Sequence, residues 1–96
     1  MAYFPFVSYS FVKFEKSKSL GKKYDAILLN KKTERTSRVP FGQLGYEQYK
    51  DSTGLGLYTH MNHLDPRRRT SYKLRHAGDI KTGNYSAGYF SMKYLW

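Results

Sequence analysis

Positive charge dominates this sequence and restricts the folds that are open to it. The 96 residues include 17 Lys and Arg against 7 Asp and Glu, which gives a formal net charge of +10 at pH 7. A chain this short has one modest core and buries roughly 60–65% of the surface that its unfolded form exposes. A body so small and basic repels itself and attracts polyanions. The sequence therefore predicts one small domain with an anionic partner, such as nucleic acid, lipid headgroups or an acidic protein face.

The rest of the composition is that of an ordinary folded protein. Hydrophobic residues make up 40% of the chain and charged residues 25%, which argues against wholesale disorder. The sequence has no Cys, so disulfides, thiolate metal ligands and thiol nucleophiles are excluded. The absence of Cys is consistent with assembly inside a cell. The start lacks the basic region of a secretory signal, and no window approaches the roughly 20 apolar residues of a membrane span. We expect a soluble protein or a component of an assembly.

Residues 1–21 are expected to form an extended aromatic arm and a basic connector outside the domain. Apolar side chains alternate here with Ser8 and Ser10, as in a strand with one apolar face. Pro5 cannot donate to a strand ladder, and the polar residues 16–23 favour a turn or loop. An aromatic edge of this kind needs covering, either by its own domain or by a neighbouring protein. The candidate partner-binding residues of the arm are Tyr3, Phe4, Phe6, Val7, Tyr9 and Phe11.

Residues 22–96 are expected to form the domain itself, a small fold of the α+β class. Within it, residues 23–30 alternate as a buried strand, and residues 34–39 return as a polar strand rich in β-branched side chains. The turn between them makes the pair a β-hairpin with one solvated face. Pro40 is expected to break the second strand, and a short helical turn is expected to begin at 46–49.

Two helices are predicted in the second half of the chain. Asp65 and Pro66 mark the start of a basic helix, because Asp accepts hydrogen bonds from free backbone N–H groups and Pro suits the first helical position. This helix is expected to run to about His76 and to stop at Gly78. Ser86 is the predicted cap of a C-terminal aromatic helix. Its side chains at helical spacing, expected to dock on the sheet, are Tyr89, Met92 and Trp96.

The basic helix carries the strongest chemical signal in the chain. Arg presents a planar fork that matches phosphate or carboxylate and always keeps its charge, and nearby Tyr rings can stack on exposed bases. A run of charge specifies no ligand, and a solvated helix that pairs with carboxylates explains it equally well. The candidate residues for binding a partner or polyanion are Arg67, Arg68, Arg69, Tyr72, Lys73, Arg75 and His76.

Neither catalysis nor a metal or other cofactor is predicted. The 7 carboxylates are scattered, and no nucleophile is accompanied by a base and an orienting group. His60, His63 and Asp65 have metal-ligating atoms, but their spacing is not the i, i+4 spacing that places two ligands on one helix face. Tyr72 among cations is a conceivable phosphoryl acceptor, although a structural Tyr is the simpler interpretation in a chain with 10 of them. The sequence indicates a binding or structural protein.

Four spaced motifs lie between residues 22 and 96. They are Lys23-Tyr24-x-Ala26, Phe41-Gly42-x-x-Gly45-Tyr46-x-x-Tyr49, His63-x-Asp65-x-x-Arg68-x-x-x-Tyr72-x-x-Arg75-His76 and Ser86-Ala87-Gly88-x-x-Ser91-x-x-Tyr94-Leu95-Trp96. In these motifs the chain resembles a family of small basic proteins of uncharacterised role from large nucleocytoplasmic DNA viruses, including chlorella viruses and mimiviruses. Residues 77–85 lack the Trp-rich segment of those relatives, which also continue beyond the equivalent of Trp96.

The resemblance implies a structural virion protein of a large DNA virus. In its concrete form this is a minor capsid component that bridges other capsid proteins, or acidic protein surfaces, through the aromatic arm and the basic helix. Its location would be the virion and, during assembly, the virus factory of the host cell. The alternative is a sequence-independent DNA-binding or genome-packaging protein held by phosphate contacts.

Overall fold

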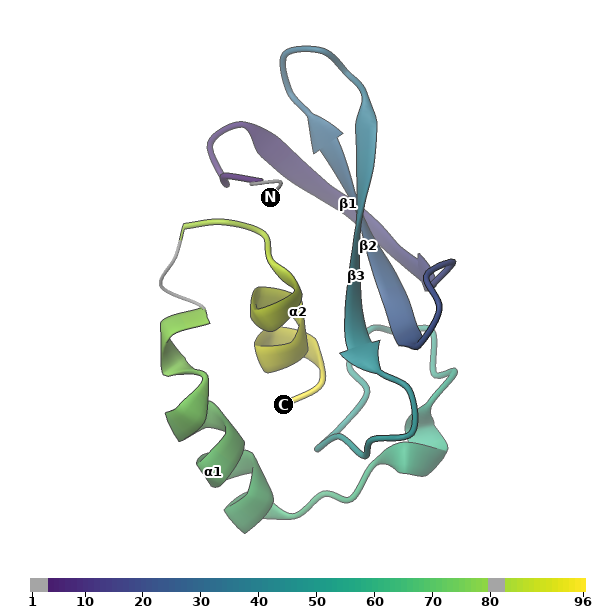
Figure 1. The fold of residues 1–96 in the computed structure, drawn as a ribbon, viewed down its shortest axis with the longest axis vertical. Helices are drawn as coiled ribbons and strands as arrows, with labels where there is room; N and C mark the ends of the chain where they lie inside the picture. Colours follow the sequence, from purple (N-terminus) through teal and green to yellow (C-terminus); the bar gives the residue numbers. More distant parts are fainter. Residues whose placement is uncertain (1–3, 80–82) are drawn as a thin grey trace.

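An antiparallel sheet, covered on one face by a helix, forms the body of the protein (Figure 1). A computed structural model of the chain describes residues 4–79 and 83–96. Within these residues the strands are β1 (Tyr9–Lys16), β2 (Lys22–Asn30) and β3 (Thr36–Gln43), and the helices are α1 (Pro66–Arg75) and α2 (Ala87–Tyr94). Short 3₁₀ turns lie at Thr59–Met61 and Ala77–Asp79. The predicted α+β class is confirmed.

Strand β2 is the central strand and is buried on both faces. The strand order is β1-β2-β3, with both pairs antiparallel. On the face towards α2, Tyr24 and Leu28 are 0% exposed. On the other face, Arg38 of β3 crosses the sheet and pairs with Asp25 at 3.1 Å and with Glu15 at 2.6 Å. The predicted hairpin of β2 and β3 is confirmed. The prediction that one of its faces is solvated is wrong for β2, where Asp25 and Ile27 are also buried.

Strand β1 belongs to the sheet, so the prediction of a separate arm over residues 1–21 is wrong for residues 9–16. These residues pair with β2, with an irregularity in the register after Phe11. The ring centroids of Phe11 and Phe14 lie 5.7 and 5.9 Å from that of Phe90 in α2. The apolar face predicted for this segment is covered by the chain's own core, because packing there removes the rings from water without a second molecule.

Two local predictions in the middle of the chain are also wrong. Strand β3 does not end at Pro40, which is paired with Asp25 inside the strand. An edge strand directs every second N–H away from the sheet, so a Pro at such a position costs no ladder hydrogen bond. Residues 46–49 form no helical turn, because Gln48 forms an isolated bridge with Asn62 instead.

The predicted caps of both helices are confirmed. The Asp65 carboxylate accepts hydrogen bonds from the backbone N–H of Arg67 at 2.9 Å and of the following residue at 3.4 Å. The Ser86 hydroxyl accepts from the backbone N–H of Tyr89 at 3.1 Å. Each cap satisfies N–H groups that have no acceptor inside the helix. Short polar side chains therefore determine where the two helices begin.

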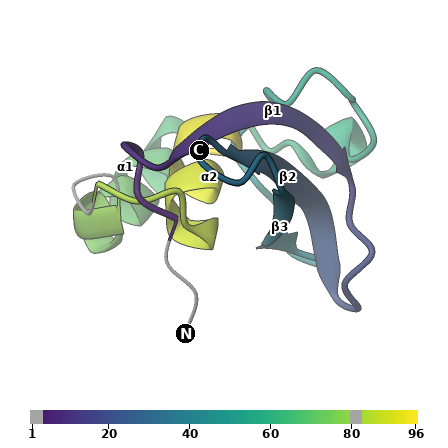
Figure 2. The same ribbon diagram turned by 90° about the horizontal axis from the view of Figure 1, so that it is seen from above.

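Helix α2 lies between the sheet and α1, as views from two directions show (Figures 1 and 2). Its residues Phe90 and Met92 are buried, together with Leu95 just after it, while Tyr89 and Trp96 are partly buried. The docking face is therefore centred on Phe90. By contrast, α1 contains no buried residue. Neither of these helices, nor any other among the described residues, is long and apolar enough to cross a membrane.

Candidate polyanion-binding cavity

A cavity of about 600 Å³ lies where α1, the first turn of α2 and the ends of β2 and β3 meet. This volume is within the range of sites that hold small molecules. Five of its lining residues are cationic and one is acidic, and Tyr46, Tyr72 and Trp96 add aromatic rings. The charged lining residues are Lys22, Lys23, Glu47, Arg67, Arg68 and Arg75. A cavity with this excess of positive charge favours an anionic occupant.

Helix geometry places part of the positive charge of α1 on the cavity side. Arg67, Ser71 and Arg75 are spaced four residues apart, so they share one face of the helix, and Arg68 and Tyr72 lie beside them. Within the described residues, the side chains of Arg67 and Arg75 have no ion-pair or hydrogen-bond partner. Two guanidinium groups of the cavity are therefore available to a ligand.

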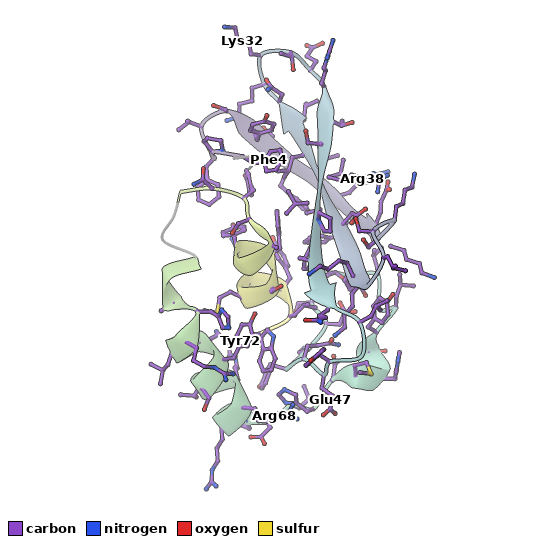
Figure 3. The ribbon with its side chains drawn as sticks, in the orientation of Figure 1. Phe4, Lys32, Arg38, Glu47, Arg68 and Tyr72 are labelled. Atoms are coloured by element: carbon purple, nitrogen blue, oxygen red, sulfur yellow. The ribbon has the colours of Figure 1, made fainter. Side chains whose placement is uncertain are left out.

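Arg68 and Arg69, which follow Arg67 on α1, attach this helix to the rest of the protein. Arg68 pairs with Glu47 at 3.1 Å, and Figure 3 shows the two side chains together near the start of α1. The Nε of Arg69 donates to the backbone oxygen of Trp96 at 2.8 Å, and its guanidinium lies 4.9 Å from the centroid of the Tyr49 ring. Arg69 therefore makes a structural contact through its Nε, and it does not line the cavity.

The structure divides the predicted basic site into two groups. Lys73 and His76 do not line the cavity, and the ring of His76 stacks on that of Tyr72 at 4.3 Å. The cavity thus receives only part of the positive charge that the sequence places on this helix. The predicted residues that line it are Arg67, Arg68, Tyr72 and Arg75.

Lys23 is one of the cavity residues that the sequence analysis did not identify. It is only 2% exposed, and its ammonium donates to the backbone oxygen of Tyr46 and to Oε1 of Gln48. Burial lowers the pKa of Lys23, and the charge of Asp51 opposes that shift. In the sequence Lys23 alternates with Tyr24 and is therefore expected on a solvated strand face. Nothing local shows that a distant loop folds over it.

That loop, between β3 and α1, is held by buried polar groups. Gln48 is 1% exposed, and its amide donates to the backbone oxygen of Tyr58 and to Oδ1 of Asn62, each at 2.7 Å. The hydroxyl of Tyr24 donates to Asp51, and burial together with this hydrogen bond raises the pKa of Tyr24 to about 12. Satisfied buried networks of this kind fix one arrangement of a loop. They position the cavity wall that contains Gln48.

His63 lies beneath α1 and is used within the fold. Its Nδ1 accepts a hydrogen bond from the backbone N–H of Asp65 at 2.9 Å, and its ring centroid lies 5.1 Å from that of Trp96. Its Nε2 is buried and has no hydrogen-bond partner among the described residues. No group of three His, Cys, Asp or Glu side chains in the described part of the chain is arranged to hold a metal ion.

The predicted arm residues lie apart from the cavity lining. Tyr3 is outside the described residues. Val7 is 83% exposed, whereas the described rings make aromatic contacts inside the protein. The distances between ring centroids are 5.1 Å for Phe4 and Tyr9, 4.6 Å for Phe6 and Tyr85, and 4.7 Å for Phe11 and Phe14. The structure therefore does not combine arm and basic helix into one surface.

The protein has a small α+β fold with a basic, partly aromatic cavity. Planar guanidinium groups and ammonium groups in one concavity suit phosphate or carboxylate oxygens. No family model, no curated protein and no solved structure matches this chain. Its function is therefore inferred from the chemistry of the cavity.

Proposed function

We propose that this protein binds nucleic acid through phosphate contacts, independently of base sequence, with the basic cavity and its rim as the contact surface. The observation that carries the proposal is that Arg67 and Arg75 lie on one face of α1 without partners among the described residues, in the same cavity as Lys22 and Lys23. Uncompensated cations gathered in one place oppose folding unless an anion neutralises them. A binding role needs no catalytic group.

Nucleic acid fits this surface better than an acidic protein for two reasons. The net charge of +10 exceeds what the cavity alone requires, and a long polyanion can neutralise charges both inside and around it. Tyr46 lines the cavity and is 64% exposed, so its ring is available to stack on an unpaired base.

A salt titration tests this function. The logarithm of the affinity for a short DNA duplex should fall linearly with the logarithm of salt concentration, with a slope of about −0.9 for each neutralised phosphate. Duplexes of unrelated sequence should bind equally well, because phosphate contacts contain no sequence information. Failure to bind any duplex or single strand at low salt would rule out the proposal.

A second proposal is a structural role in the particle of a large DNA virus, as a minor capsid component that bridges other capsid proteins. The supporting observation is the outer edge of β1, which pairs with no further strand in the part of the chain that the structure describes and beside which Val7 is 83% and Val12 50% exposed. An unpaired edge with apolar side chains can add a strand from a neighbour. The protein would then reside in the virion and, during assembly, in the virus factory. Substituting Val12→Lys should reduce incorporation into purified particles, and unchanged incorporation would exclude this edge.

A further inference from the structure

The ammonium of Lys23 is buried beside the cavity, and among the described residues no carboxylate lies in direct contact with it, although the charge of Asp51 acts on it from farther away. Its two acceptors, the carbonyl oxygen of Tyr46 and the amide oxygen of Gln48, are both neutral. It forms no ion pair with any described residue. A buried charge is costly unless it is paired, and an ammonium has three donors. Lys23, Tyr46 and Gln48 all line the cavity, so an anion there would supply a direct ion-pair partner.

Donors converge on the cavity from separate elements of the fold. Strand β2 contributes Lys22 and Lys23, while α1 contributes Arg67 and Arg75. The first turn of α2, where backbone N–H groups lack intrahelical acceptors, contributes two more lining residues. Ser91 also lines the cavity, is 9% exposed, and its hydroxyl has no hydrogen-bond partner within the described residues. An anion in the cavity would therefore be contacted on several sides at once.

We propose that the cavity binds the terminal phosphate monoester of a nucleic-acid strand, with Lys23, Arg67 and Arg75 as its main cationic contacts. A backbone diester is flanked by a sugar on each side, so a continuous strand cannot present it to donors that surround it. A terminal monoester projects from the strand and has a charge of about −1.5 to −2 at neutral pH. The inference depends on the proposed function, because the rest of the strand is bound by the rim around the cavity.

The test compares oligonucleotides of one sequence that end in a 5′-phosphate, a 3′-phosphate or hydroxyl groups only. Either phosphorylated form should bind about tenfold more tightly than the hydroxyl form, as expected for one set of charge-assisted hydrogen bonds. A gain at only one end supports the inference and identifies that end. A free nucleoside monophosphate should compete weakly. If it binds as tightly as the phosphorylated oligonucleotide, the strand end is not the ligand.

Variants separate this inference from the general binding function. Lys23→Met should remove the preference for phosphorylated ends. Binding of the hydroxyl oligonucleotide should weaken by no more than the loss of one cation and should stay salt-dependent. Since Lys23 is buried, Arg75→Gln provides a second variant at an exposed position, where the preference should also decrease. Lys32→Met, at the far hairpin turn, is the matched control and should keep the preference (Figure 3).

The outcomes distinguish the two proposals. Equal binding of phosphorylated and hydroxyl oligonucleotides, with salt dependence intact, would overturn the terminal-phosphate site and leave the general function standing. A preference that survives unchanged in both Lys23→Met and Arg75→Gln would also overturn the site. Absence of binding by every oligonucleotide at low salt would overturn the general function and with it this inference.

Discussion

The ring of Tyr72 lies parallel to the indole of Trp96, with 4.2 Å between the ring centroids and 4° between their planes. Tyr72 belongs to α1, which has no buried residue of its own. The stack, the hydrogen bond from Arg69 to the Trp96 backbone and the exposed pair of Arg68 with Glu47 attach this helix to the body. An exposed ion pair contributes only about 0–1 kcal/mol. The aromatic stack is therefore a principal anchor of one cavity wall.

A double-mutant cycle measures that anchor. Tyr72→Leu and Trp96→Leu should each destabilise the protein, and their effects should be non-additive by about 0.5–1.5 kcal/mol, the usual coupling of an aromatic pair. Chemical denaturation of the four proteins gives the coupling. Leu74→Ala, on the same helix at a residue that is 77% exposed, is the control and should change stability by less than about 0.5 kcal/mol. Strict additivity would show that the stack does not attach α1.

Gly42 and Gly45 allow backbone strain to be separated from packing. Both have positive φ, 74° and 85° respectively, but only at Gly42 would a Cβ approach neighbours, at 2.9 Å from Leu95 and 3.3 Å from Lys23. Gly45→Ala should cost about 1 kcal/mol for the backbone conformation alone. Gly42→Ala should cost about 1–3 kcal/mol more, because Leu95 is buried and cannot move freely. Equal losses in thermal or denaturant unfolding would mean that the cavity floor is loosely packed.

The hydroxyl of Tyr24 connects the sheet to the loop that covers Lys23. It donates to Asp51 and accepts from the backbone N–H of Leu57 at 3.1 Å. Tyr24→Phe leaves both groups without this partner and should destabilise the protein by about 1–3 kcal/mol. Tyr46→Phe, at an exposed ring, is the matched control and should be nearly neutral. Denaturant unfolding checks the pair, and a neutral Tyr24→Phe would contradict a structural role for this hydroxyl.

Stability should depend on pH through His63. Burial and the nearby charge of Arg68 hold the pKa of His63 below its ordinary 6.5, although Glu47 and Asp65 oppose the shift. The unfolded chain therefore binds a proton more readily than the folded protein, so stability is lost as pH falls from about 6.5 and levels off below the folded-state pKa.

The variant His63→Asn isolates this effect. In the parent protein the backbone N–H of Asp65 donates to Nδ1 of His63 at 2.9 Å. An Asn side chain keeps an acceptor for this N–H but does not titrate. Its melting temperature should therefore fall less than that of the parent protein between about pH 7.5 and about pH 5. Parallel falls in the two proteins would assign the acid sensitivity to other groups.

What could be predicted from the sequence depends on whether the cause was local. Asp65 and Ser86 identified both helix starts, because a cap acts on N–H groups two or three residues away. The prediction that Pro40 ends its strand failed, because a strand tolerates Pro only at the edge of a sheet and the strand order is not a local property of the sequence. The rings of 4–14 could be recognised as apolar, but their covering by α2 is a contact between distant segments.

The candidate site shows the same division. Helical periodicity places Arg67 and Arg75 on one face of α1, and this could be derived from spacing alone. The use of Arg69 to bind the Trp96 backbone could not, because the two residues are brought together only by the fold. The burial of Lys23 could not be predicted either, because it depends on the register of β2 with β3 and on the path of the loop that contains Gln48.

The central claim is that the cavity, and not the overall charge, binds the polyanion. The most direct measurement compares DNA affinity across salt concentrations for two variants that each lose two cations. In Arg67→Gln/Arg75→Gln the slope of log affinity against log salt should become shallower by about 1.8, the equivalent of two phosphate contacts. In Lys32→Gln/Arg35→Gln, altered in the turn between β2 and β3, both slope and affinity should stay near those of the parent protein. Figure 3 shows Lys32 at the end of the molecule opposite to Arg68. Equal losses in the two variants would contradict the claim, because binding would then follow net charge alone.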